Sequence, residues 1–275
     1  MEITGTVLDF NHHHHYQYHP KRANIDVNFL TMLYQQYHHF KWLIDFGREW
    51  QAPFTYHQIK LHQADYLKIQ QNFPSLTLSQ FIYFAVIYEQ HPLNMQKITF
   101  NDNDPLVQIY LPLPWFQHYG KLWYRLVQQS IPIALQKWQN IQLLPAYKMN
   151  INLLNYFLHL MPKNINHQKI LALIQRYATT CRSQASMLRI HLSPTLNTRL
   201  NQEADKWHIS PSHLVQALIM KAMLFDKTSH IVSTSTTDPL IQINLNRQLL
   251  KDIRAKLPNF HWQDLLSQLI RANIA

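Results

Sequence analysis

Glycine is scarce in this sequence, and its scarcity excludes several kinds of site. The 275-residue chain contains 3 glycines, Gly5, Gly47 and Gly120, and no two of them lie close together. The GxGxxG motif of dinucleotide-binding folds and the GxxxxGKS or GxxxxGKT phosphate loop therefore cannot be written anywhere. The GxSxG nucleophile elbow is excluded for the same reason.

The chain also lacks the residues for disulfides, cysteine-rich metal centres and membrane spans. Its single cysteine, Cys181, excludes an internal disulfide and every multi-cysteine zinc or iron–sulfur site, and fits a reducing, cytoplasmic location. The longest fully apolar or aromatic run, Phe81 to Tyr88, is eight residues long, whereas a transmembrane helix needs about 20. Because no basic start followed by an apolar stretch opens the chain, we expect no signal peptide and no membrane partner.

Acidic residues are few and unevenly spread. Asp and Glu total 15 against 25 Lys and Arg, a formal net charge of +10. Residues 1–137 hold 10 basic and 9 acidic residues, whereas residues 138–275 hold 15 and 6. Aromatic residues run the other way, with 25 of the 34 in the first part. A basic half indicates a polyanionic partner, nucleic acid first, although many soluble proteins are basic without a specific partner.

No constellation of residues indicates catalysis or metal binding. The carboxylates do not cluster in pairs, and the residues after Cys181 are typical of a connector, so we expect neither an enzyme nor a cofactor. His12 to His15 invite a metal interpretation. Only Asp9 accompanies them, so we expect a flexible His-rich arm over residues 1–22 and no metal site.

A short segment recurs along the chain. Asp104 to Ile109 reads Asp-Pro-Leu-Val-Gln-Ile, and Asp238 to Ile243 reads Asp-Pro-Leu-Ile-Gln-Ile. Both are alternating segments after a turn-forming Asp-Pro, which predicts strands with one buried face. Leu249, Ile253 and Leu257 then recur every fourth residue, which predicts a helix, and a second helix follows Pro258.

The same strand–helix–helix unit precedes this one. Leu188, Ile190 and Leu192 form its alternating strand, and Ser210-Pro211-Ser212 is typical of the start of its second helix. Weaker copies open near Ile25, Ile59, Val107 and Met149, which gives up to six units. The alternative is a set of coincidental strands among ordinary helices.

The unit has a known counterpart. Met187 to Pro194, followed by the Ser210-Pro211-Ser212 helix start, resembles the ribbon-helix-helix DNA-binding superfamily of MetJ, Arc and CopG proteins, and the stretch from Ile241 to Ile274 is similar to it as well. The resemblance covers about 90 residues. It implies a mainly α fold with short β-strands, an α+β class, in which strands pair as antiparallel two-stranded ribbons to form up to three pseudo-dimers.

Two pairings of the six units fit the sequence. In the first, consecutive units pair, which gives a degenerate pair at 23–100, a second pair at 104–181 and a C-terminal DNA-binding pair at 185–275. In the second, units two and three pair, as do units five and six, because each of these two pairs shares a long polar connection. Units one and four then pair with each other, and the chain is a duplicated three-unit block.

In the superfamily, outward strand residues read base edges in the major groove. Carried over by position, one group of six residues would contact bases, and a second group at two helix starts would hold phosphates through free backbone N–H groups. Arg suits guanine, while Asn and Gln suit adenine. The alternative is that polar outward residues are simply solvated. The base-contact group is Arg189, His191, Ser193, Gln242, Asn244 and Asn246, and the phosphate group is Ser210, Ser212, His213, His261 and Gln263.

The upstream strands are poorer candidates for DNA contact. A secondary set consists of Gln58 and Lys60 in one unit, with Lys148, Asn150 and Asn152 in another. We expect other upstream units to keep the fold without touching DNA. The aromatic-rich N-terminal half would then pack on itself, bind a protein partner or mediate self-association.

The resemblance implies a double-stranded DNA-binding protein, nucleoid-associated in the cytoplasm and acting as a transcriptional repressor or regulator. One alternative is an accessory protein that organises plasmid or phage DNA in a relaxosome, in partition or in copy control. Another is a protein-interaction scaffold built on the same repeat fold.

Overall fold

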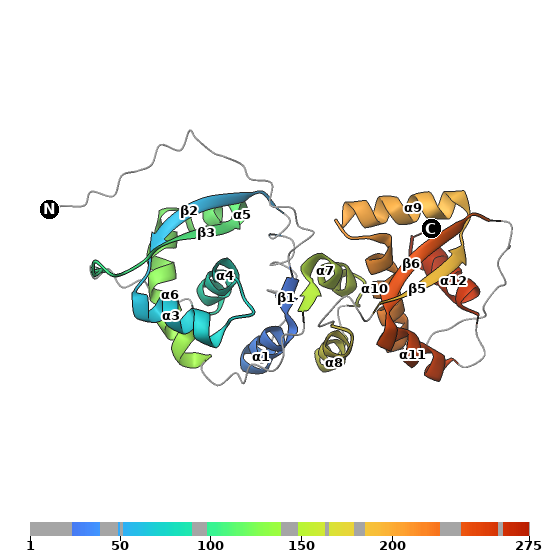
Figure 1. Ribbon diagram of the computed structural model, residues 1–275, viewed down its shortest axis with the longest axis horizontal. Helices are drawn as coiled ribbons and strands as arrows, with labels where there is room; N and C mark the ends of the chain where they lie inside the picture. The colour runs from blue at the N-terminus through green and yellow to red at the C-terminus, as the bar shows by residue number, and fades with distance from the viewer. Residues whose placement is uncertain are drawn as a thin grey trace. The chain divides into compact units, whose positions relative to one another are not determined.

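The computed structural model describes residues 24–38, 49, 52–89, 98–138, 148–162, 165–178, 185–225, 238–257 and 261–274. The expected arm at 1–22, Cys181, Pro258 and most of the two long polar connections lie outside the described residues. The chain divides into two compact units (Figure 1). Unit 1 contains residues 1–19 and 48–141, and unit 2 contains residues 20–47 and 142–275.

Both units combine helices with short antiparallel strands, which confirms the α+β class. The elements of unit 1 are β2 (Phe54–Lys60), α3 (Gln63–Asn72), α4 (Leu78–Tyr88), β3 (Leu106–Pro112), α5 (Leu113–Tyr119), the 3-10 turn η2 (Gly120–Leu122) and α6 (Trp123–Lys137). Those of unit 2 are β1 (Asn24–Asp26), α1 (Val27–Tyr37), β4 (Lys148–Asn150), α7 (Ile151–His159), α8 (His167–Tyr177), β5 (Ala185–His191), α9 (Pro194–Lys206), α10 (Pro211–Phe225), β6 (Leu240–Asn246), α11 (Arg247–Lys256) and α12 (Trp262–Ile274).

Strand pairing follows the second of the two arrangements that fit the sequence. Among the described residues, β2 pairs with β3, β5 with β6 and β1 with β4, each antiparallel. The ranges 23–100 and 104–181 therefore exchange strands with each other instead of pairing internally. A local pattern of period two fixes which side chains are buried but carries no information on the partner strand.

The two longer ribbons share one register. The N-terminal ribbon, β2/β3, joins Phe54 to Pro112 at one end and Lys60 to Leu106 at the other. The C-terminal ribbon, β5/β6, joins Ala185 to Asn246 and His191 to Leu240 in the same way. Because both ribbons pair seven residues of each strand, their positions correspond one to one.

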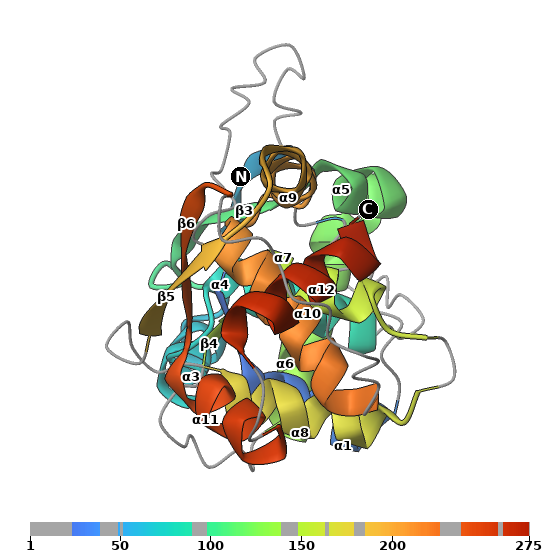
Figure 2. The same cartoon turned by 90° about the vertical axis from the view of Figure 1, so that its right-hand side faces the viewer.

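The inner face of each ribbon is apolar. Ile59, Ile109, Ile190 and Ile243 are fully buried. The second helices of the units pack against the ribbons: α4 contacts β3, α10 contacts β6 and α12 contacts β5. Figure 2 shows α10 and α12 crossing each other beside β5 and β6. Eight consecutive residues of α4 and seven of α10 are buried, since helices that are apolar on all sides occupy the centre of a core.

The third pair of strands is shorter than the sequence pattern predicts. The alternation that opens at Ile25 and Met149 continues in the sequence to Val27 and Phe29 and to Ile151 and Leu153, but these four residues lie in the helices α1 and α7. Asp26 and Asn150 cap these helices by accepting hydrogen bonds from backbone N–H groups two and three residues ahead. These caps end the strands, because an N-cap turns the chain into a helix at once.

Three of the second helices, α4, α10 and α12, are each fastened to the opposite strand by their second residue. The Tyr110 N–H of β3 donates to Ser79 Oγ of α4 at 3.0 Å, and the Asn244 N–H of β6 donates to Ser212 Oγ of α10 at 3.0 Å. The Gln263 amide of α12 bonds both the N–H and the C=O of His191 in β5. These bonds fix the ribbons against the helices that support them.

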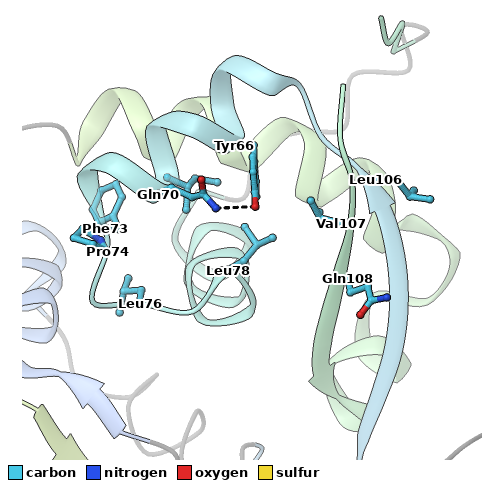
Figure 3. A pocket seen from close by; sticks show the side chains of 10 residues that line it. Tyr66, Gln70, Phe73, Pro74, Leu76, Leu78, Leu106, Val107 and Gln108 are labelled. Atoms are coloured by element: carbon cyan, nitrogen blue, oxygen red, sulfur yellow. Dashed lines mark hydrogen bonds between the residues drawn. The ribbon is translucent and has the colours of Figure 1, made fainter. Parts of the chain in front are cut away.

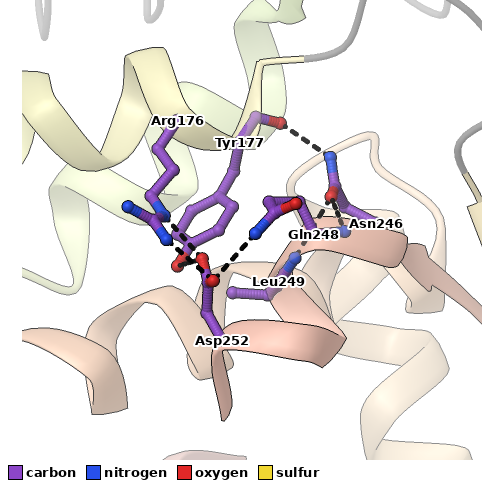
Figure 4. A network of polar contacts seen from close by, with 6 residues as sticks. All are labelled: Arg176, Tyr177, Asn246, Gln248, Leu249 and Asp252. Carbon is purple, nitrogen blue, oxygen red and sulfur yellow. Dashed lines mark hydrogen bonds and ion pairs between the residues drawn. The ribbon is translucent and has the colours of Figure 1, made fainter. Parts of the chain in front are cut away.

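A polar network joins α8 to α11 within unit 2 (Figure 4). The Arg176 guanidinium donates to both Asp252 carboxylate oxygens at 2.5 and 2.8 Å, and the Tyr177 hydroxyl donates to Oδ2 at 2.8 Å. The hydrogen bonds and the positive charge from Arg176 lower the pKa of Asp252 to about 2. Burial raises the pKa of Tyr177, so its hydroxyl keeps its proton.

A pocket of about 640 Å³ lies between α3, the start of α4 and β3 in unit 1 (Figure 3). Its lining holds no charged side chain, and the amide of Gln70 donates to the hydroxyl of Tyr66 at 2.7 Å. The pocket thus has few polar groups with which to orient a ligand. Among the helices that the structure describes, none has the length and apolar content to cross a lipid bilayer.

Candidate nucleic-acid interface

The outer face of the C-terminal ribbon is a small grid of paired side chains. Arg189 lies directly opposite Gln242 at its centre, and both are exposed. On one side of this pair Met187 faces Asn244, and on the other His191 faces Leu240. The structure thus brings Arg189, His191, Gln242 and Asn244 onto one ribbon face, as the alternating pattern predicts.

The central pair has the chemistry for reading base edges. The Arg189 guanidinium presents a planar fork of donors that matches the two major-groove acceptors of guanine. The Gln242 amide carries one donor group and one acceptor, which matches adenine. Directly opposite positions on an antiparallel pair hold Cβ atoms about 5 Å apart, so both side chains would reach neighbouring bases.

His191 and Ser193 are more constrained than expected. His191 is half-buried, and its Nδ1 lies 2.6 Å from the carbonyl oxygen of Asp238, which leaves Nε2 as the ring atom for an outside partner. Ser193 caps α9, with its Oγ accepting from the Leu196 N–H at 3.4 Å. Ser193 therefore serves the helix start.

Asn246 belongs to the protein core. It is 5% exposed, its Oδ1 accepts from the N–H groups of Gln248 and Leu249, and its Nδ2 donates to the Tyr177 carbonyl at 3.2 Å (Figure 4). The expectation that Asn246 faces outward is wrong, because the alternation of the strand ends one residue early, at the N-cap of α11.

The start of α10 lies beside β6. Ser210 caps the helix by accepting from the His213 N–H at 3.2 Å, and Ser212 accepts from the Asn244 N–H. Burial lowers the pKa of His213, so this imidazole stays neutral at physiological pH and offers a hydrogen bond without charge. A helix start of this kind favours an anion, since its first N–H groups point outward.

The start of α12 lies beside β5. His261 is exposed, and its carbonyl accepts from the Leu265 N–H at 3.1 Å. The side-chain amide of Gln263 accepts a hydrogen bond from the His191 N–H and donates one to the His191 carbonyl. Of the two residues predicted to hold phosphate here, His261 is accessible, whereas the Gln263 side chain positions the ribbon.

The N-terminal ribbon repeats the grid with different chemistry. Gln58 faces Gln108 at its centre, and Lys60 faces Leu106. At the other side Tyr56 faces Tyr110, with ring centroids 5.5 Å apart. This face carries one cation and a pair of tyrosines in place of Arg189 and its neighbours.

The other part of the predicted secondary set, Lys148, Asn150 and Asn152, does not form the outer face of a ribbon. Lys148 is exposed. Asn150 caps α7, and Asn152 lies inside that helix, 1% exposed, with its Nδ2 donating to the His208 carbonyl at 3.2 Å. The prediction that Asn152 points outward from a strand is wrong, because α7 begins at Ile151, whereas Asn150 ends β4 and uses its side chain as the helix cap.

The formal charge separates between the two units more sharply than between the halves of the sequence. Unit 1 contains seven basic and seven acidic residues, whereas unit 2 contains 18 and 8. The whole net charge of +10 therefore belongs to unit 2, which carries the C-terminal ribbon. The redistribution arises because residues 20–47 join unit 2 through β1 and α1.

The sequence pattern misses three residues at this face. Met187 and Leu240 are 53% and 51% exposed on the outer side of the ribbon. Each stands next to another apolar residue, so alternation alone does not say which of the two points outward. Arg247, at the first position of α11, is exposed and its Nε lies 3.4 Å from Ser186 Oγ at the ribbon's end.

Within the part of the chain that the structure describes, no cluster of three or more His, Cys, Asp or Glu residues could hold a metal ion. Comparisons with protein-family models, with curated proteins and with solved structures find no match to this chain.

Proposed function

We propose that this protein binds double-stranded DNA by laying the outer face of the C-terminal ribbon in the major groove, in the manner of the ribbon-helix-helix superfamily. The observation that carries the proposal is the exposed pair of Arg189 and Gln242, directly opposite each other in a unit that holds all the net positive charge. Arg and Gln are the side chains that pair bidentately with guanine and adenine.

The proposed contacts are fewer than the sequence pattern predicts. Arg189, Gln242 and Asn244 would read bases, with His191 contributing through Nε2. The N–H groups at the start of α10, beside Ser210 and Ser212, would bind a phosphate next to the ribbon. Ser193, Asn246 and Gln263 are left out, because each is engaged in holding a helix or strand in place.

Unit 1 supports a second, complementary role. Its ribbon is neutral apart from Lys60, and Tyr56 is 38% exposed beside Tyr110. Aromatic faces without net charge favour protein contacts over phosphate contacts. In a repressor or a DNA-organising accessory protein, unit 2 would hold DNA while unit 1 recruits a protein partner or a second copy.

The test is recovery of bound sequences from a random duplex pool by the full-length protein. Enrichment of a short motif that contains guanine and adenine supports the proposal. Affinity for the recovered duplex should fall steeply as salt rises, because each neutralised phosphate releases a counterion. A pool that stays random together with a flat salt response would favour the scaffold alternative and overturn DNA binding.

A further inference from the structure

Large apolar side chains recur at one position of both ribbons. Within the described residues, six large hydrophobic side chains are exposed, and four of them stand two residues before the central outward polar residue of a strand. The four are Tyr56, Leu106, Met187 and Leu240, which precede Gln58, Gln108, Arg189 and Gln242.

The recurrence follows the symmetry of the ribbons. Antiparallel pairing relates Met187 to Leu240 by a pseudo-two-fold axis through the Arg189–Gln242 pair, because Met187 faces Asn244 and Leu240 faces His191. An apolar group therefore stands at two diagonal corners of the C-terminal ribbon, with polar groups at the other two. About half of each of these two residues is exposed to water. Burying them against a partner would remove apolar surface from water, which favours binding.

We propose that Leu240 and Met187 are specificity-determining residues that contact the C5-methyl groups of thymines in the major groove. This inference rests on the proposed DNA binding and deepens it by naming a base. In the major groove the thymine methyl is an apolar feature that apolar side chains recognise. The positive charge of unit 2 favours DNA over a protein as the partner that covers these two side chains.

The spacing suits this reading. Residues two apart on a strand lie about 6.8 Å apart, which is about two base steps at 3.4 Å each. Leu240 would therefore reach a base one or two steps away from the base that Gln242 reads. The ribbon would prefer a core with guanine or adenine at its centre and thymine at both flanks.

The experiment replaces single thymines of the pool-selected duplex by deoxyuridine, which keeps base pairing and removes only the methyl group. Fluorescence anisotropy with the full-length protein measures affinity for each duplex. Loss of one buried methyl should weaken binding about fourfold at one or two positions. The L240A variant should bind the thymine and deoxyuridine duplexes equally at one of those positions, and M187A at the other.

Matched variants separate the outcomes. L240M keeps an apolar group and should keep the methyl effect, while L67A removes an exposed leucine of α3 in unit 1 and should also keep it. Methyl sensitivity that persists in both L240A and M187A, or that is absent from the unaltered protein, overturns the inference while leaving salt-dependent DNA binding intact. Failure to bind any duplex overturns the proposed function and the inference together.

Discussion

Gln263 holds His191 by its main chain, with the amide of α12 bonding both the N–H and the C=O of a residue in β5. The side chain thus acts as an additional strand partner at the end of the ribbon. A ribbon of two strands is marginal by itself, so such side-chain supports are needed to hold its outer face rigid.

Q263A should therefore destabilise unit 2. The loss of two hydrogen bonds to part-buried backbone groups is expected to lower the free energy of unfolding by about 1–3 kcal/mol. Urea denaturation followed by circular dichroism measures the change. Q202A, at an exposed position of α9, is the matched control and should stay within about 0.5 kcal/mol. Equal stability of the two variants would contradict the supporting role of Gln263.

Substitutions of the two asparagines of β6, Asn244 and Asn246, should affect different properties, one DNA binding and the other stability. N246A removes the cap of α11 and leaves the Tyr177 carbonyl without its donor, so we expect a loss of about 2–4 kcal/mol in unfolding free energy. N244A removes an exposed side chain and should leave stability unchanged within about 0.5 kcal/mol while weakening DNA binding. Urea denaturation measures the unfolding free energy of both variants, and fluorescence anisotropy measures their DNA affinity.

The matched glutamines of the two ribbons test which ribbon reads DNA. Gln242 and Gln108 occupy the same position in the same register. Q242A should weaken binding to the selected duplex by about 1–3 kcal/mol and relax the preference at one base pair, as should R189A. Q108A should leave affinity unchanged. Equal losses for Q242A and Q108A would show that the N-terminal ribbon contacts DNA as well.

Asp252 should make stability depend on acid pH. Its pKa is lowered from 3.8 to about 2 by Arg176, so the folded state favours the carboxylate. The resulting stabilisation is complete above the unfolded value near 4 and is lost as the pH falls from 4 to 2. In denaturation curves at these pH values, the stability difference between the unaltered protein and D252N should shrink across this window. A constant difference would argue against the ion pair.

His213 should make stability fall with falling pH in the same direction as Asp252, but in a higher pH range. Burial lowers its pKa from 6.5, so the folded protein prefers the neutral ring. Its contribution is favourable above pH 6.5 and declines as the pH falls below that value, where the unfolded state takes up the proton. H213L should reduce the loss of stability between pH 7.5 and 5.5, as measured by thermal unfolding. An unchanged loss would show that other histidines dominate the response.

The sequence predicts the elements of the C-terminal pair well, because their alternation and helix periods are regular. Ile190 and Ile243 are buried, whereas Arg189 and Gln242 are exposed, as period two requires. The pattern fails at its ends. Asn246 belongs to both an alternating strand and a helix cap, and Asn150 does too, so the outward position and the buried cap are indistinguishable until the first helical turn is located.

Which strands pair, and which apolar side chains lie on the outer face of the ribbon, can be assigned only from the structure. Pairing is a long-range choice among strands with similar local patterns, which explains why the arrangement of β1 with β4 stays open at the level of sequence. Met187 precedes Leu188, and Leu240 precedes Ile241, so the apolar content of these strands hides their outward members. Register resolves the ambiguity by placing Met187 and Leu240 on the face of Arg189 and Gln242.

The pairing of β1 with β4 has a consequence for biogenesis. Asn24 of β1 pairs with Asn150 of β4. The first described strand therefore cannot form its ribbon until β4 has been synthesised, after the last residue of unit 1. Unit 1 has its own ribbon and core helices and can fold while the chain is still growing, since domains generally fold as units and the earlier one first. Unit 2 completes its folding after unit 1, because β1 can pair only once β4 has been synthesised.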